Sequence, residues 1–154
     1  MIHNFSNFKA VPDSIWKWPS FSPREMACKG TGKLIIDTDA MDKLQGLRDL
    51  LGRPLIITSA YRSPEHNRAV GGAKRSKHME GIAFDVRMEN HDPYEFEKAA
   101  RTVGFKGFGF YRKSGFMHID IGPERSWGKR WPEITKTDWP TEPPRQPETI
   151  KEDK

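Results

Sequence analysis

The segment SKHMEGIAFD, residues 76–85, constrains the fold of this chain more than any other. His78 and Asp85 are seven residues apart, about two turns and about 10 Å of a regular helix, which is too far for both to bind one ion. If the chain instead turns at Gly81 and continues as a strand, its side chains alternate between two faces. Those faces are Ala83, Asp85 and Arg87 on one side and Ile82, Phe84 and Val86 on the other. Asp85 then lies beside a strand that returns toward His78, and the pair forms two thirds of a metal site.

A candidate third ligand lies in the downstream segment GFMHIDIG, residues 115–122. His118 and Asp120 are two apart on a predicted strand and therefore share a face, whereas the alternate positions are apolar and point to the core. Such a polar face is expected to line a cleft. His78, Asp85 and His118 together give three protein ligands with one position open, which is typical of catalytic zinc, because structural zinc sites usually have four protein ligands. Bound zinc lowers the pKa of its water to about 7 and polarises a carbonyl, as hydrolysis requires.

The remaining histidines and the cysteine are interpreted as structural. His3 and His66 are expected to be non-ligands. His91 is the reserve ligand because it follows the Asp85 strand closely, although it precedes a helix cap and is expected to be exposed. Cys28 is the single cysteine, so an internal disulfide and a cysteine-built zinc finger are excluded, and it is expected to be a buried small apolar residue.

The rest of the body is predicted to alternate between helices and strands. Helices are expected over 37–51, 63–69 and 92–103. The first has Asp37 or Thr38 as its cap and Gly52 at its end, and the last has Asp92 as its cap and Glu95 placed for a capping box. Strands are expected over 54–62 and in a hairpin of 108–111 with 116–122. This grouping predicts an α+β fold, a single domain with a small antiparallel sheet flanked by helices.

Charge and composition divide the 154 residues into a basic body and a polar tail. Residues 132–154 contain five prolines, four basic and six acidic residues, so they carry −2 of the total +5, and residues 1–131 carry +7. The tail is predicted to be extended or disordered, with Trp139 as a possible anchor to the domain. A basic body favours nucleic acid, anionic membrane or the bacterial cell wall as a partner, or it is simply a solvated surface.

The sequence argues against several classes of protein. No apolar run approaches the roughly 18 residues of a membrane span. The N-terminus lacks a basic start followed by an apolar core, so no secretory signal is predicted and synthesis in the cytoplasm is expected. No basic stripe interleaved with aromatic residues supports nucleic-acid binding, which rests on the +7 body alone.

The pattern SxHxxGxAxD, followed by a downstream HxD strand, resembles the zinc D-Ala-D-Ala carboxypeptidase and endopeptidase family, which cuts peptidoglycan stem peptides. Lysostaphin-type peptidases and hedgehog zinc domains are more distant relatives. The resemblance covers residues 21–131 and none of the tail. It implies a hedgehog/D-Ala-D-Ala peptidase-like fold for 1–131, a Zn²⁺ cofactor and a peptidoglycan stem peptide as the substrate. By position, His78, Asp85 and His118 match the three zinc ligands.

The resemblance also implies roles for two residues that face the substrate. Arg62 matches a basic residue whose fork can bind a substrate carboxylate or stabilise the oxyanion, so it is both a catalytic and a substrate-binding candidate. The alternative is a structural hydrogen bond to the loop. Ser76 matches a serine that holds the substrate carboxylate in carboxypeptidases, and its alternative is a turn or capping serine.

The general base is not fixed by the resemblance. Some relatives place a glutamate three residues before the third ligand, where this chain has Gly115, and others have a His-x-His pair, where this chain has His118-x-Asp120. Asp120 is therefore the catalytic candidate that moves the proton of the water to the leaving amine. Alternatively, it orients His118 through the other ring nitrogen. Glu80, near His78, is an outside candidate.

These observations predict a zinc metallopeptidase that hydrolyses peptide bonds involving D-amino acids in peptidoglycan. A catalytically inert, zinc-containing wall-binding module is the first alternative, and a nucleic-acid binder is the second. Because an export signal is not predicted, a phage lysis enzyme or a virion-associated enzyme is expected to act on the wall. A monomer is expected unless the chain is part of a virion. The residues do not distinguish a carboxypeptidase from a cross-link endopeptidase.

Overall fold

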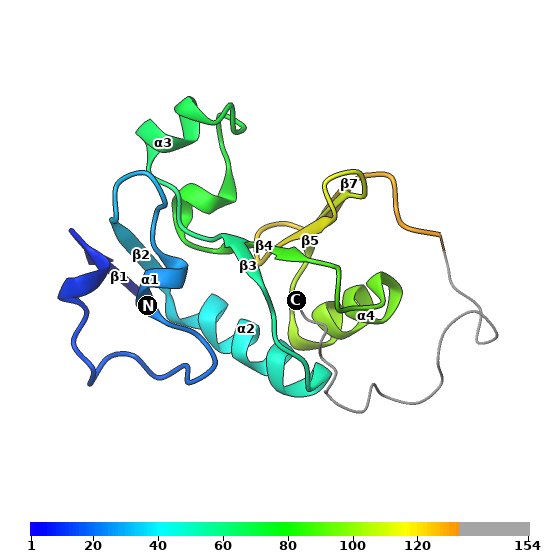
Figure 1. Cartoon of the computed structure of the whole chain (residues 1–154), viewed down its shortest axis with the longest axis horizontal. Helices are drawn as coiled ribbons and strands as arrows, with labels where there is room; N and C mark the ends of the chain where they lie inside the picture. Colours follow the sequence, from blue (N-terminus) through cyan, green and yellow to red (C-terminus); the bar gives the residue numbers. More distant parts are fainter. Residues whose placement is uncertain (133–154) are drawn as a thin grey trace.

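Helices and strands form largely where capping residues and apolar periodicity predict them. The computed structural model describes residues 1–132, and Figure 1 traces the elements along the chain. In chain order the elements are β1 (Ile2–Phe5), the 3₁₀ helix η1 (Phe8–Ala10), α1 (Pro23–Met26), β2 (Leu34–Asp37), α2 (Thr38–Leu51), β3 (Ile57–Ser59), α3 (Pro64–Ala69), the 3₁₀ helix η2 (Lys77–Glu80), β4 (Ala83–Arg87), α4 (Pro93–Val103), β5 (Gly107–Tyr111), β6 (Phe116–Asp120) and β7 (Arg125–Gly128).

The central sheet has five strands in the order β3-β4-β6-β5-β7. The first four strands pair antiparallel, and β5 and β6 form the predicted hairpin. Helices and strands in one small domain confirm the predicted α+β class. Two details differ from the prediction: β7 pairs parallel with β5 at the edge, and β1 with β2 forms a separate two-stranded sheet. The sheet is therefore mixed rather than purely antiparallel.

The two long helices begin and end at the predicted residues. The Asp37 side chain accepts from the backbone N–H groups of Asp39 and Ala40 in the first turn of α2, and Gly52 ends that helix in the left-handed conformation, at φ 69°. Asp92 caps α4, and Gly104 ends it in the same way. Glu95 makes no hydrogen bond to the cap, so the predicted capping box is wrong there. The two helices contact each other on the lower side of Figure 1, and their buried residues join the core.

Alternation along the inner strands separates an apolar face from a polar one. The apolar face contributes buried core side chains, namely Phe84, Val86, Phe108, Phe110, Met117 and Ile119. On the opposite face, Asp85 pairs with His118 and Ala83 pairs with Asp120 across the β4–β6 ladder. The sheet therefore holds the polar candidates on one rigid surface, away from the core.

The strand predicted over 54–62 is shorter in the structure. Only Ile57–Ser59 forms β3, and the pairing register with β4 shifts between Ile57 and Ser59. The following residues leave the ladder, which frees the carbonyl of Ala60 to accept a hydrogen bond from the His78 ring, at 2.7 Å. The shortened strand therefore contributes to the site.

His91 is buried, so its predicted exposure is wrong. Only 6% of its surface is exposed, its Nε2 donates to the carbonyl of Pro54 at 3.0 Å, and its ring lies 5.3 Å from that of Phe96. His91 is thus a satisfied core residue rather than a ligand. Burial lowers the pKa of His91 from its ordinary 6.5 to about 4, although the hydrogen bond to Pro54 opposes the shift.

This buried histidine predicts an acid-sensitive fold. Between pH 6.5 and 4 the unfolded chain protonates His91 and the folded chain does not, so stability falls as pH falls through that window. The full shift corresponds to about 3 kcal/mol. Urea unfolding at pH 7 and pH 4.5 should show a smaller loss for His91→Gln, whose amide can still donate to Pro54, than for wild type. Equal losses in the two proteins would contradict this role.

The prediction of an extended or disordered tail concerns residues 132–154, of which 133–154 lie outside the described residues. Trp139 belongs to that segment. None of the helices within residues 1–132 has the length and apolar content needed to cross a lipid bilayer.

Candidate metal centre

Three side chains from three different elements meet on the polar face of the sheet. His78 comes from η2, Asp85 from β4 and His118 from β6, and all three are buried. One ligand atom from each lies within 4.8 Å of the others. Gly81 makes this possible: it ends η2 in the left-handed conformation at φ 75°, so the chain turns and enters β4 as predicted.

The second nitrogen of each imidazole is held by an acceptor, which fixes the proton. His78 donates from Nδ1 to the carbonyl of Ala60 at 2.7 Å, and His118 donates from Nε2 to Asp120 Oδ2 at 2.6 Å. The remaining nitrogens, His78 Nε2 and His118 Nδ1, each lie 3.1 Å from Asp85 Oδ1. One nitrogen of each imidazole therefore faces the same carboxylate, and a cation bound by these two nitrogens and the carboxylate would satisfy all three groups. The donor set fits a divalent metal.

Asp85 supplies the negative charge of this set. Burial would raise the pKa of its carboxyl, but the contacts with the His118 and His78 rings outweigh burial and lower the pKa to about 2. The group is therefore a carboxylate at neutral pH. Its second oxygen, Oδ2, lies 3.9 Å from Arg62 Nη2.

Asp120 lies behind His118 and is fully buried. Its Oδ1 accepts from Gly122 N and Arg125 Nη1, and its Oδ2 accepts from Arg125 Nη2 and His118 Nε2. Burial would raise the pKa of Asp120, but hydrogen bonds from His118 and Arg125 lower it well below its ordinary range. The same bond to Asp120 helps to raise the pKa of His118 against the effect of burial. Asp120 is therefore an ionised acceptor aimed at the far side of the His118 ring.

The edge strand β7 adds two residues that the sequence did not place beside the metal ligands. Arg125 pairs with Asp120, and Trp127 lies over His118 with a centroid distance of 5.0 Å. Trp127 Nε1 also donates to the hydroxyl of Tyr111 at 2.9 Å. Both side chains cross β5 where it has glycine, and a Cβ at Gly109 would lie 2.6 Å from the Trp127 ring. The alternating glycines of GFGFY were the available signal, because glycine inside a strand often marks a close approach.

Gly109→Ala is expected to displace Trp127 from His118. The added methyl group must move the indole, because ordinary carbon contacts begin near 3.4 Å. The fluorescence of Trp127, isolated by comparison with Trp127→Phe, should shift toward that of a solvated indole. Gly46→Ala is the matched control, since its Cβ would lie in ordinary contact 3.8 Å from Val103. Unchanged emission in Gly109→Ala would contradict the packing of Trp127 on Gly109.

A cleft of about 440 Å³ opens over the three candidate ligands and is also lined by Arg62 and Ser76. Arg62 donates to Asn67 Oδ1 at 2.9 Å and to Ser59 Oγ at 3.1 Å, so these two hydrogen bonds hold the guanidinium in place. Ser76 caps η2 by accepting from His78 N at 3.2 Å.

Glu80 is not brought to the cleft. Its side chain is 53% exposed and pairs with Lys77 at 2.9 Å, and it is absent from the described lining of the cleft. The remaining histidines are also kept apart from the centre, since neither His3 nor His66 belongs to the cluster found among residues 1–132.

Fold and site together define an α+β domain with three candidate metal ligands at the base of a cleft, an arrangement typical of metallohydrolases. The chain belongs to the peptidase M15 family, whose model matches residues 19–120. This match confirms the family predicted from the motifs, and it contains all three candidate ligands and Asp120. Arg125 and Trp127 lie beyond it.

Two groups of curated relatives are similar to this chain. Peptidoglycan L,D-endopeptidase MepK of Escherichia coli K12 is 39% identical over 99 residues, which cover 60% of this chain and 54% of the relative. Zinc D-Ala-D-Ala carboxypeptidase of Streptomyces albus G is 34% identical over 91 residues, covering 56% of this chain and 36% of the relative. The aligned region thus spans about half the length of the MepK relative and a smaller share of the carboxypeptidase.

Proposed function

We propose that this chain is a zinc-dependent peptidase that hydrolyses peptide bonds involving D-amino acids in peptidoglycan. Membership in the peptidase M15 family supports a peptidase, and the names of the relatives support zinc and a peptidoglycan substrate. The observation that carries the proposal is the buried set of His78, Asp85 and His118, in which one nitrogen of each imidazole lies 3.1 Å from the same carboxylate oxygen.

The residues around the centre suit hydrolysis of a peptide with a nearby carboxylate. When bound, zinc would supply a water of lowered pKa and polarise the scissile carbonyl. Arg62 has N–H donors beyond those used by Asn67 and Ser59, and these can bind the substrate carboxylate or the oxyanion. Ser76 accepts from His78 N, so its hydroxyl proton remains available to the substrate carboxylate.

For Asp120, the geometry supports an orienting role over that of a general base. Its Oδ2 holds the proton on His118 Nε2, so His118 Nδ1 stays free as a ligand toward Asp85. Both of its oxygens are already occupied by donors from His118, Arg125 and Gly122, and none of its surface is exposed. We therefore assign Asp120 to the positioning of His118 rather than to proton transfer.

The inert wall-binding module is retained as the second candidate for one reason. Gly115 replaces the glutamate of some relatives, and within residues 1–132 the lining of the cleft includes no glutamate. If no other group accepts the proton of the water, the domain would bind the wall without cutting it.

Digestion of purified sacculi, followed by mass spectrometry of the muropeptides, tests the proposal. Cross-linked dimers should fall to monomers if the chain is an endopeptidase, or terminal D-alanine should be released if it is a carboxypeptidase. A chelator should stop either reaction, and added zinc should restore it. Products that are insensitive to the chelator would contradict zinc dependence. Binding to sacculi without any product would instead support the inert module.

The expected place of action, as a phage lysis or virion-associated enzyme, stays a proposal, as does the monomeric state. Size-exclusion chromatography with light scattering tests the latter.

A further inference from the structure

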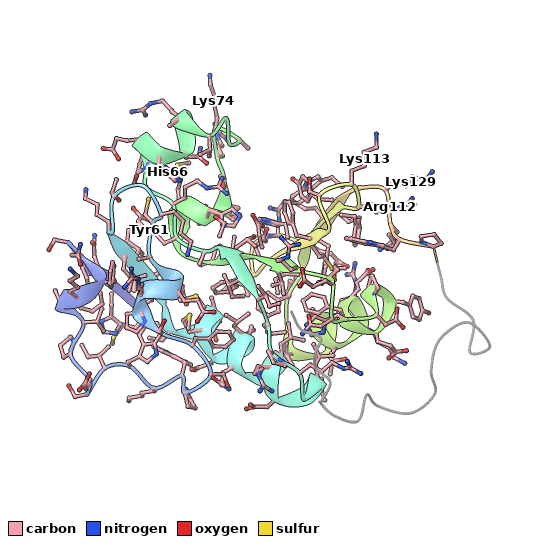
Figure 2. The ribbon with its side chains drawn as sticks, in the orientation of Figure 1. Tyr61, His66, Lys74, Arg112, Lys113 and Lys129 are labelled. Carbon is pink, nitrogen blue, oxygen red and sulfur yellow. The ribbon has the colours of Figure 1, made fainter. Side chains whose placement is uncertain are left out.

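A second hollow, larger than the cleft, lies beside the β5–β6 hairpin. Its volume is about 660 Å³, and we call it the hairpin groove. It is lined by the aromatic side chains of Phe110, Tyr111 and Trp131 and by the cations of Arg112, Lys113 and Lys129. Figure 2 shows the three cations together at the outer end of the hairpin, with Lys113 projecting furthest from the ribbon. The groove is thus both aromatic and basic.

The charge of the hairpin groove has no acidic partner among residues 1–132. Arg112 donates at 3.5 Å to the backbone carbonyl of Arg130, and neither Lys113 nor Lys129 forms an ion pair there. Arg130 differs, because Glu97 holds its guanidinium at 2.9 Å. All three groove cations are exposed. As far as residues 1–132 are concerned, they are therefore available to an anionic ligand.

The aromatic side chains give the groove a firm wall. Tyr111 stacks on Phe116 with centroids 4.5 Å apart and planes 9° from parallel, and 38% of its surface remains exposed. Trp131 packs edge-on against Phe110 at 6.5 Å. Such amphipathic rings contact the apolar faces of a ligand and leave its polar groups to solvent or to cations.

Tyr111 connects the groove to the metal cleft, because it lines both hollows. Its hydroxyl accepts from Trp127, which lies over His118. Arg62 and Arg75 also line the cleft, so both hollows carry cations. A ligand longer than the cleft would therefore pass Tyr111 and enter the hairpin groove.

We propose that the hairpin groove is a second binding site that holds the carboxylate-bearing glycan–peptide polymer of the cell wall beside the metal cleft. The choice of polymer rests on the proposed function. Sugar rings would lie against Tyr111 and Trp131, and substrate carboxylates would pair with Arg112, Lys113 and Lys129. The groove thereby distinguishes intact wall, which fills both hollows, from a short peptide, which fills the cleft alone.

The test uses the full chain with Lys113→Gln and Lys129→Gln combined. Lys9→Gln with Lys17→Gln is the matched control, because it removes the same charge from two exposed lysines that line neither hollow. Co-sedimentation with purified sacculi, in the presence of a chelator, should weaken about fivefold or more in the groove variant and little in the control. The difference should shrink at high salt, since salt screens exposed charges.

Hydrolysis provides a second readout. The groove variant should lose activity on sacculi and keep wild-type activity on a short soluble stem peptide. Equal sedimentation of wild type and groove variant, or equal losses in the groove variant and the control, would overturn the proposal. It would also be overturned if duplex DNA displaced the protein from sacculi at a lower concentration than soluble glycan does. Because sedimentation needs no hydrolysis, groove-dependent binding without any cleavage would refute the proposed function alone.

Discussion

Asp85→Ala is expected to remove bound zinc and to abolish hydrolysis of cell walls. Asp85 is the carboxylate of the candidate centre, and its Oδ1 lies 3.1 Å from both His78 Nε2 and His118 Nδ1. Without it, only two imidazoles remain, which bind zinc far more weakly than a three-ligand set that includes a carboxylate. Zinc content measured on the purified variant should fall from about one ion per chain to near zero. Release of muropeptides should fall to that of the chelated wild-type protein.

Two further variants separate metal loss from unfolding. Asp85→Asn keeps the shape of the side chain, so its melting temperature shows whether loss of charge alone unfolds the chain. His3→Ala is the control for removing a histidine, because His3 lies on β1, outside the cluster. Asp85→Ala with full zinc content and full activity would refute the assignment of the centre.

Asp120→Asn is expected to weaken zinc binding by about 10- to 100-fold, since Asp120 holds the ligand His118 in place. In wild type, His118 Nε2 and Arg125 Nη2 both donate to Oδ2, and Arg125 Nη1 donates to Oδ1. Each carboxylate oxygen of Asp120 accepts two hydrogen bonds, and an asparagine has only one acceptor oxygen, so its NH₂ group must face two donors and two of the four bonds are lost. Competition with a chromogenic chelator measures the change in affinity. Activity should recover when zinc is added to saturation.

The recovery at saturating zinc distinguishes the two roles of Asp120. If Asp120 were the general base, Asp120→Asn would bind zinc normally and kcat would stay low however much zinc is added. Glu80→Gln is the matched control, because Glu80 is exposed and pairs with Lys77 outside the cleft. It should retain wild-type zinc affinity and activity. A loss of kcat in Glu80→Gln would revive Glu80 as the base.

The three candidate ligands could be predicted because local rules fix their positions. Gly81 adopts φ 75°, so η2 must end there, and the alternation after it sets which face of β4 carries Asp85. The two-residue spacing of His118 and Asp120 likewise places both on one face of β6. Short-range geometry and strand alternation are readable from sequence, and antiparallel pairing then brings the two strands together.

Features that depend on contacts distant in the sequence could not be predicted in the same way. The strand β7 is short, exposed and polar, so neither apolar alternation nor a turn signal indicates its parallel pairing with β5. The positions of Arg125 and Trp127 follow from that pairing. The burial of His91 depends on the carbonyl of Pro54, 37 residues away. Tertiary contact overrode the polarity of the histidine, which alone favours the surface.

The most direct test of the candidate centre is a crystal structure of the zinc-loaded protein with anomalous data collected at the zinc edge. The expected result is one peak among the three side chains, about 2.0–2.2 Å from His78 Nε2, His118 Nδ1 and an oxygen of Asp85. His118 Nε2 should still donate to Asp120. A zinc-loaded crystal with no peak at this position, or with its zinc bound by other residues, would contradict the assignment.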